Sequence, residues 1–182
     1  EVKAAEAIAK LNGVAWGLIK VPRMAGKSPL TNVEVDLGKY DNINLLPGGI
    51  EPTFVPGRNI IFLALAANRA GARGAEAIIT GLCQEDYGGY PDCRRAFVDS
   101  MERSINMGLK GSSPPIRIIT PLMRLTKAES VKLAVAEGAM GSLALSHTCY
   151  DGARPPCGKC HACHLRARGF EEAGIPDPLT DV

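Results

Sequence analysis

The sequence lacks any apolar run close to the roughly 18 to 20 residues that cross a bilayer as a helix. Such a helix is therefore not expected within these 182 residues. It also lacks a large excess of charge, because 21 basic and 19 acidic side chains leave a net charge of +2. This balance gives no overall attraction to nucleic acid or to a membrane surface, so any anion must be bound by a few placed bases. Internal repeats are absent too, which argues against a repeat architecture.

What is present fits one globular domain. Hydrophobic residues make up 46% of the chain and charged residues 22%, and this length is enough to bury a sizeable core. Four of the six cysteines lie within fifteen residues near the C-terminus. A secreted disulfide scaffold is shorter, with its cysteines spread along the chain. The clustering indicates metal ligands in a reducing compartment, so the cytoplasm is the expected location.

Apolar periodicity and turn residues predict alternating helices and strands. Helices are predicted over 2–11, 60–72, 91–107 and 126–137, and strands over 14–21, 33–37, 75–82 and 116–120. The helix over 60–72 is apolar nearly all round, which predicts that it is buried. Thr126 and Glu129 form a predicted capping box. Stretches rich in Pro and Gly predict loops over 22–32 and 40–57. The alternation predicts an α/β fold with a mainly parallel sheet and helices on its faces.

Basic residues stand at the starts of three predicted helices, at Arg58, Arg94 and Lys127. A cation at a helix N-terminus is unfavourable by roughly 0.3–1 kcal/mol. In an open parallel sheet these helix starts meet at the carboxyl edge, where ligands bind. The bases are therefore expected to converge there on an anion, a phosphate or a carboxylate. The alternative is that each is an ordinary surface cation.

Two acidic residues lie close to these bases. Asp86 follows a predicted strand, and Asp92 lies in the first turn of a predicted helix. Either carboxylate is suited to bind magnesium on a nucleotide. Asp92 is equally suited to cap its helix.

The cysteine cluster has the spacing Cys149-x7-Cys157-x2-Cys160-x2-Cys163. Two-residue gaps let a tight turn direct two thiolates at one ion, and four thiolates complete a tetrahedral zinc shell. Because such a shell leaves no position for water, the zinc is predicted to be structural. Disulfides and an iron–sulfur cluster are the alternatives.

Other residues near the cluster have simpler interpretations. His161 and His164 are not needed as ligands, and Cys83 is expected to pack in the core. Arg166 and Arg168 follow the cluster and suggest an RNA-binding tail. The acidic residues around them and the lack of aromatic residues beyond Phe170 argue against it, so nucleic acid is not expected as a partner.

Several motifs occur in an order that resembles the 7-cyano-7-deazaguanine synthases, the QueC family. These motifs are VPGRN (55–59), EDYGGYPDCR (85–94), PLMRLTKAE (121–129), SHTCYDG (146–152), CGKCHACHLRARGF (157–170) and AGIPDP (173–178). The resemblance covers nearly the whole chain. The YPDCR element and the four-cysteine tail are specific to it, whereas LTKAE recurs more widely among ATP pyrophosphatases.

The resemblance implies a Rossmann-like sheet of the adenine-nucleotide alpha hydrolase type. It implies a nucleotide-binding region over 1–145 and a zinc-binding segment over 146–182. The implied reaction converts 7-carboxy-7-deazaguanine and ammonia to 7-cyano-7-deazaguanine through adenylated acid and amide intermediates. ATP, bound with Mg²⁺, is the co-substrate, and the implied protein is a cytoplasmic homodimer. The expected catalytic residues are the cations Lys127, Arg58 and Arg94, which would neutralise phosphate charge. The expected nucleotide-binding residues are Arg58, Asn59, Asp86, Asp92 and Lys127.

The sequence departs from the family pattern at two places. The family's Ser-Gly-Gly-x-Asp-Ser phosphate loop is absent, and the loop over 22–32 has no counterpart. Because Glu1 stands inside a helical pattern, a strand and loop of roughly thirty or more residues are expected upstream. Two alternatives stay open: a related ATP enzyme that stops at the amide or thiolates tRNA, and a non-catalytic zinc-stabilised binding module.

Overall fold

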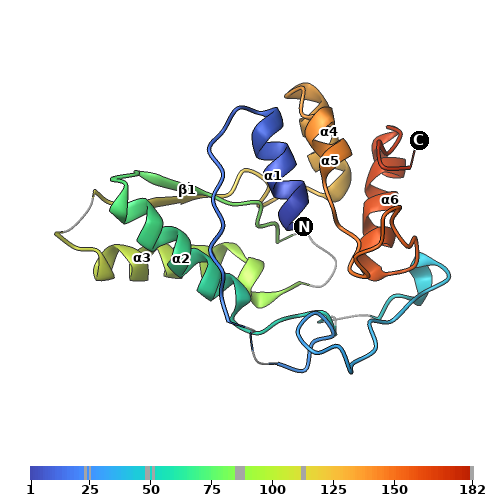
Figure 1. The fold of residues 1–182 in the computed structure, drawn as a ribbon, viewed down its shortest axis with the longest axis horizontal. Helices are drawn as coiled ribbons and strands as arrows, with labels where there is room; N and C mark the ends of the chain where they lie inside the picture. Colours follow the sequence, from blue (N-terminus) through green and yellow to red (C-terminus); the bar gives the residue numbers. More distant parts are fainter. Residues whose placement is uncertain are drawn as a thin grey trace. The chain divides into compact units, whose positions relative to one another are not determined.

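The computed structural model describes residues 1–22, 24, 26–47, 50, 52–84, 89–111 and 114–180. The chain divides into two compact units (Figure 1). The first joins Glu1–Gly48 to Thr126–Val182, and the second is Gly49–Leu125. Each unit has its own cluster of buried side chains, one aliphatic and one built around cysteines.

The second unit is built on a pair of parallel strands. Its described elements are α2 (Arg58–Ala72), β1 (Ala77–Ile79), η2 (Pro91–Cys93, a 3-10 helix), α3 (Arg95–Gly108) and β2 (Arg117–Ile119). Ile78 of β1 lies opposite Ile118 of β2, and both are buried. Helix α2 packs against β1, and α3 packs against β2. The α/β class and the strands predicted over 75–82 and 116–120 are therefore confirmed, as a small parallel sheet.

Side chains of α3 hold the backbone of β2 and of the residue before it. The Asn106 amide donates to the carbonyl of Ile116 at 2.8 Å and accepts from its N–H at 2.8 Å. The Glu102 carboxylate accepts from the N–H of Ile118 at 2.6 Å. Residues four apart share one face of a helix, so a single face of α3 makes both contacts. These side chains pair backbone groups that would otherwise form an open strand edge.

The first unit consists of helices around the cysteine cluster. Its described elements are α1 (Val2–Leu11), η1 (Ile43–Leu45, a 3-10 helix), α4 (Lys127–Ala136), α5 (Met140–Leu145) and α6 (His161–Ala173). Helix α4 packs along α6, and α1 packs beside α5. The predicted capping box is confirmed: the Glu129 N–H donates to Thr126 Oγ1 at 3.1 Å, and the Thr126 N–H donates to Glu129 Oε2 at 2.8 Å.

The strands predicted over 14–21 and 33–37 are wrong. Residues 14–21 have no regular structure, and residues 33–37 form turns and irregular chain. A strand is stable only beside a partner. Within the described part of the chain, β1 and β2 pair with each other and with neither segment.

The prediction that α2 is buried all round is also wrong. Leu63, Ala67 and Ala70 form a narrow buried stripe, because these positions recur along one face of a helix. Ile60, Ile61 and Phe62 are 48%, 38% and 48% exposed.

The helix predicted over 91–107 is divided in two. Arg94 is extended, with φ −83° and ψ 151°, and separates η2 from α3. Val98 and Ile105 are buried as expected, and Phe97 and Met101 pack against the same core.

The predicted loops fall only partly on described residues. Arg23 and Ala25 of the loop over 22–32 lie outside them, as do Gly48, Gly49 and Glu51 of the stretch over 40–57. The described part of that second stretch includes η1. In the part of the chain that the structure describes, no helix has the length and apolar character that crossing a membrane requires.

Candidate functional site

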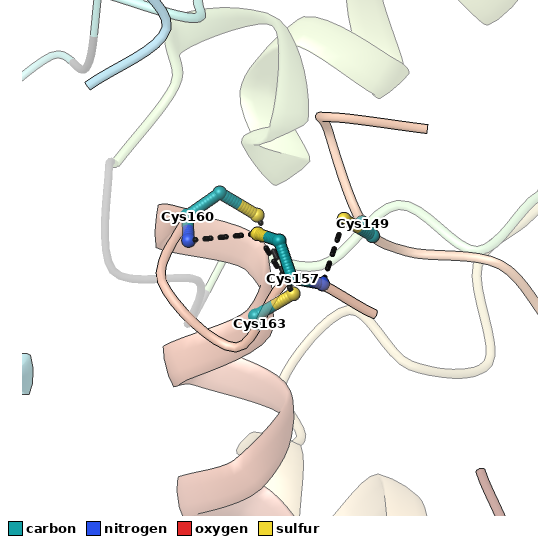
Figure 2. Close-up of side chains that lie close together, drawn as sticks. All are labelled: Cys149, Cys157, Cys160 and Cys163. Carbon is teal, nitrogen blue, oxygen red and sulfur yellow. Dashed lines mark hydrogen bonds between the residues drawn. The ribbon is translucent and has the colours of Figure 1, made fainter. Parts of the chain in front are cut away.

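Four cysteine side chains converge where α6 begins. Cys149 and Cys157 lie in the chain before this helix, Cys160 is its N-cap, and Cys163 lies in its first turn. All four sulfur atoms lie within 4.8 Å of one another. Figure 2 shows the four side chains gathered at this point. The sulfur of Cys163 is 3.5 Å from that of Cys160 and 3.9 Å from that of Cys157. The cysteines that the sequence singled out are therefore brought together.

These sulfur distances suit a metal ion better than a disulfide. A disulfide holds its sulfurs about 2.05 Å apart, and all four cysteines are free thiols. In a tetrahedral site with zinc–sulfur bonds of about 2.3 Å, neighbouring sulfurs lie about 3.8 Å apart. The donor set and its spacing therefore fit a four-coordinate metal ion.

Backbone N–H groups point at two of the sulfurs. The N–H of Cys157 donates to the sulfur of Cys149 at 3.4 Å, and the N–H of Cys160 donates to the sulfur of Cys157 at 3.3 Å. Burial would raise the pKa of Cys157, but backbone donors from Lys159 and Cys160 lower it to about 7. Burial raises the pKa of Cys160 and of Cys163. Without a cation, the cluster therefore resists holding four thiolates.

A segment before η1 is attached to this cluster. The backbone of Tyr40 donates to the carbonyl of Lys159 at 2.8 Å, and its own carbonyl lies 2.9 Å from His164 Nε2. Lys159 also pairs with Asp41 at 3.2 Å. His164 is thus committed to the Tyr40 carbonyl, in agreement with a ligand set made only of cysteines.

The three candidate bases lie at helix starts, as the sequence predicted. Arg58 is the first residue of α2, Arg94 is the N-cap of α3, and Lys127 is the first residue of α4. Arg94 donates to the carbonyl of Gly89 at 3.1 Å. Lys127 belongs to the first unit and the two arginines to the second. Convergence of all three therefore stays a prediction.

Hydrogen bonds between Asn59 and Asp92 join the segment that carries Arg58 to the segment that carries Arg94. The N–H of Asn59 donates to Asp92 Oδ2 at 3.4 Å, and its side-chain amide donates to the Asp92 carbonyl at 3.2 Å. Asp92 is 7% exposed. Its carboxylate lies beside the first turn of α2. A negative charge is favourable at a helix N-terminus, and here it offsets the positive charge of Arg58. Asp92 thus caps a helix other than its own.

Further contacts strengthen this junction. Thr53 Oγ1 lies 3.1 Å from the Tyr90 hydroxyl, and the rings of Phe54 and Tyr90 lie 5.3 Å apart. The sulfur of Cys93 lies 3.5 Å from the Asn59 amide. Asp86, the other candidate magnesium ligand, lies outside the described residues.

The basic residues after the cluster are held within the fold. Arg166 donates to both carboxylate oxygens of Asp177, at 2.6 and 2.7 Å. Arg168 lies 3.5 Å from Glu172, one turn along the same helix. The structure therefore gives Arg166 an internal partner, which weakens the interpretation of this tail as an RNA-binding element.

Sequence reasoning missed Arg95, which contacts the chain that follows each of the two strands. Its guanidinium donates to Thr120 at 3.0 Å, and its backbone N–H donates to Gln84 at 3.3 Å. Thr120 immediately follows β2, and Gln84 follows β1. Arg95 immediately follows Arg94 of the YPDCR motif, and no spacing signal distinguishes the two arginines.

The comparisons with known proteins agree with the motifs. A family model described as "Queuosine biosynthesis protein QueC" matches residues 1–174. The 7-cyano-7-deazaguanine synthase of Gloeobacter violaceus is 56% identical over 161 residues, covering 87% of this chain and 68% of that protein. The synthase of Laribacter hongkongensis is 49% identical over 183 residues, covering 98% and 76%. That of Acetivibrio thermocellus is 43% identical over 164 residues, covering 89% and 71%. The chain belongs to the QueC family.

Proposed function

We propose that this protein converts 7-carboxy-7-deazaguanine and ammonia to 7-cyano-7-deazaguanine with ATP, a step of queuosine biosynthesis. The observation that carries the proposal is the family match over residues 1–174, together with synthases 43–56% identical to the chain. The protein is accordingly an ATP-dependent enzyme that forms carbon–nitrogen bonds.

The chemistry needs two activations of the same carbon. A carboxylate oxygen first attacks the α-phosphorus of ATP, which releases pyrophosphate and leaves an acyl-adenylate. Ammonia attacks the acyl carbon, AMP leaves with that oxygen, and the amide forms after loss of a proton. A second ATP then activates the amide oxygen in the same way. Loss of AMP and of the nitrogen-bound protons leaves the nitrile.

Placed cations suit these steps, because each one develops charge on phosphate oxygens. We assign this role to Arg58, Arg94 and Lys127, whose positions at helix starts let backbone N–H groups contribute as well. The side chain of Asn59, the residue after Arg58, donates to the carbonyl of Asp92, which lies two residues before Arg94. Because Asp92 is engaged in this way, Asp86 is the better candidate for binding Mg²⁺ with the nucleotide.

The proposed fold is the Rossmann-like adenine-nucleotide alpha hydrolase type. In it, residues 1–145 bind the nucleotide and residues 146–182 bind zinc. Cys149, Cys157, Cys160 and Cys163 would hold the ion, and a closed shell of four thiolates supplies folding energy and leaves no position for substrate. The small parallel sheet and the cysteine cluster support this arrangement.

The alternative that thiolates tRNA needs a reactive cysteine outside the zinc set. Cys83 is 6% exposed and its sulfur donates to the carbonyl of Leu125 at 3.0 Å, which fits a core role. Cys93 lies against Asn59 and Asp92, which fits the junction described above. Neither arrangement favours thiolation over nitrile formation.

The proposal is tested with the product of the complete gene. Purified protein is incubated with 7-carboxy-7-deazaguanine, ammonium and Mg-ATP, and the products are identified by mass spectrometry. The nitrile should form only when ATP and ammonium are both present. Accumulation of amide alone would favour the amide-forming alternative, and failure to consume ATP would favour a binding module. Light scattering on the same sample tests the homodimer that the resemblance implies.

A further inference from the structure

A glycine in α6 lies directly against the candidate catalytic lysine. Gly169 is buried, and the helix that carries it packs along α4. A Cβ atom at position 169 would lie 2.8 Å from the Cβ of Lys127, 3.4 Å from its carbonyl carbon and 3.6 Å from its carbonyl oxygen. Cβ atoms do not approach other heavy atoms closely enough to permit the first of these contacts. Position 169 therefore accepts glycine and no larger residue without a shift of one helix.

The contacts around this point hold α6 in place and fix the shape of the first turn of α4. The first turn of α4 is fixed by the reciprocal hydrogen bonds of Thr126 and Glu129. Helix α6 begins in the cysteine cluster, and its Arg166 donates to the Ser146 hydroxyl at 2.8 Å. Helix α6 is thus held at its start and near its middle, so an added methyl group is expected to displace the backbone that carries Lys127.

We propose that Gly169 is a positioning residue, whose missing side chain sets where Lys127 lies. The inference rests on the proposed function, in which Lys127 contacts the phosphates of ATP. Gly169 lies six positions after Cys163 in the same helix, a rise of about 9 Å. The cysteine cluster therefore anchors the helix against which the catalytic lysine is placed.

The test compares Gly169→Ala with Gly108→Ala. Gly108 is the last residue of another helix, α3, and a Cβ atom there would meet nothing within 4 Å. Both substitutions raise helix propensity, so they differ in the contact with Lys127. We expect Gly169→Ala to raise the KM for ATP about tenfold or more, since small misplacements of a catalytic group are costly. The metal content should stay that of the wild type, and Gly108→Ala should keep the wild-type KM.

A double variant distinguishes positioning from general damage. If Gly169 acts through Lys127, adding Gly169→Ala to Lys127→Ala should cause no further loss of activity. A wild-type KM in Gly169→Ala, or losses that multiply in the double variant, would overturn the inference. If Gly169→Ala alone does not fold, Gly169→Ala/Lys127→Gly decides the matter. Restored folding supports the contact, and unrestored folding overturns it.

A readout independent of activity separates this inference from the proposed function. The amide of Ser130 donates to the Thr126 carbonyl at 2.9 Å within the first turn of α4. Its hydrogen exchange should be faster in Gly169→Ala than in the wild type and in Gly108→Ala. If the wild type forms no nitrile, the proposed function fails. Faster exchange would still support the positioning of this turn by Gly169, and unchanged exchange would overturn it.

Discussion

Arg166 and Asp177 form a bidentate ion pair between the middle of α6 and the segment that follows this helix. The two N–O distances are 2.6 and 2.7 Å, and the side chains are only 9% and 10% exposed. The same guanidinium donates to the Ser146 hydroxyl at 2.8 Å and lies 5.0 Å from the centre of the Phe170 ring. One arginine thus joins the chain before the cysteine cluster to the chain after α6.

Replacing Arg166 by alanine should reduce the free energy of unfolding by about 2 to 4 kcal/mol, because it leaves a buried carboxylate without its partner. Urea denaturation of the metal-bound protein measures this change. Arg168→Ala is the matched control, since its pair with Glu172 is about half exposed. That control should change stability by less than about 0.5 kcal/mol. Equal losses in the two variants would contradict the assignment of Arg166 as the joining residue.

The same pair predicts a pH dependence. Burial would raise the pKa of Asp177, but the hydrogen bonds from Arg166 and the Leu179 N–H outweigh it and lower the pKa from its usual 3.8. Because the folded pKa lies below the unfolded one, the stabilisation is complete above about pH 4 and is lost as pH falls through the folded value.

The difference in unfolding free energy between wild type and Asp177→Asn should therefore be constant from neutral pH to about pH 5 and shrink below about pH 4. Both proteins carry the same cysteines, so loss of metal in acid affects them alike. A difference that stays constant down to pH 3 or below, or that grows in acid, would argue against this carboxylate as the titrating group.

The cysteine cluster predicts about one zinc ion per chain. Cys163→Ser should lose the metal and melt at a markedly lower temperature, since structural zinc contributes folding energy. Cys93→Ser, at a cysteine outside the cluster, should keep both the metal and the melting temperature close to wild type. Elemental analysis of the purified proteins tests this. Iron in place of zinc, or folded protein without metal, would show that the assignment is wrong.

Local sequence signals predicted the elements that depend on neighbours in the chain. The capping box of Thr126 and Glu129 lies within one turn, and three of the four cysteines lie within seven residues. In such short-range patterns the spacing along the chain is enough to predict how the side chains are arranged.

Contacts between distant residues could not be predicted in this way. The Asn106 amide pairs with Ile116 across ten residues, and Gly169 meets a lysine on another helix. No periodicity marks either contact. The strand predicted over 14–21 failed for the same reason, because a strand depends on a partner that its own sequence does not reveal.

Removing the cations Lys127 or Arg58 is predicted to lower activity without lowering stability. Lys127→Ala and Arg58→Ala should each reduce ATP-dependent turnover by about tenfold or more, because both side chains would contact phosphate charge in the transition state. Their melting temperatures should stay nearly unchanged. Lys110→Ala removes an exposed cation in the turn after α3 and should leave turnover intact. Wild-type turnover in both of the first two variants would mean that they are ordinary surface charges.

The most direct test of the proposed reaction follows the oxygen atoms of the substrate. The product of the complete gene is given 7-carboxy-7-deazaguanine labelled with ¹⁸O in both carboxyl oxygens, together with ammonium and Mg-ATP. Because each activation places one carboxyl oxygen on an adenylyl group, we predict two AMP per nitrile, each carrying one ¹⁸O atom. Release of ADP and labelled inorganic phosphate, or unlabelled AMP, would contradict activation by adenylylation.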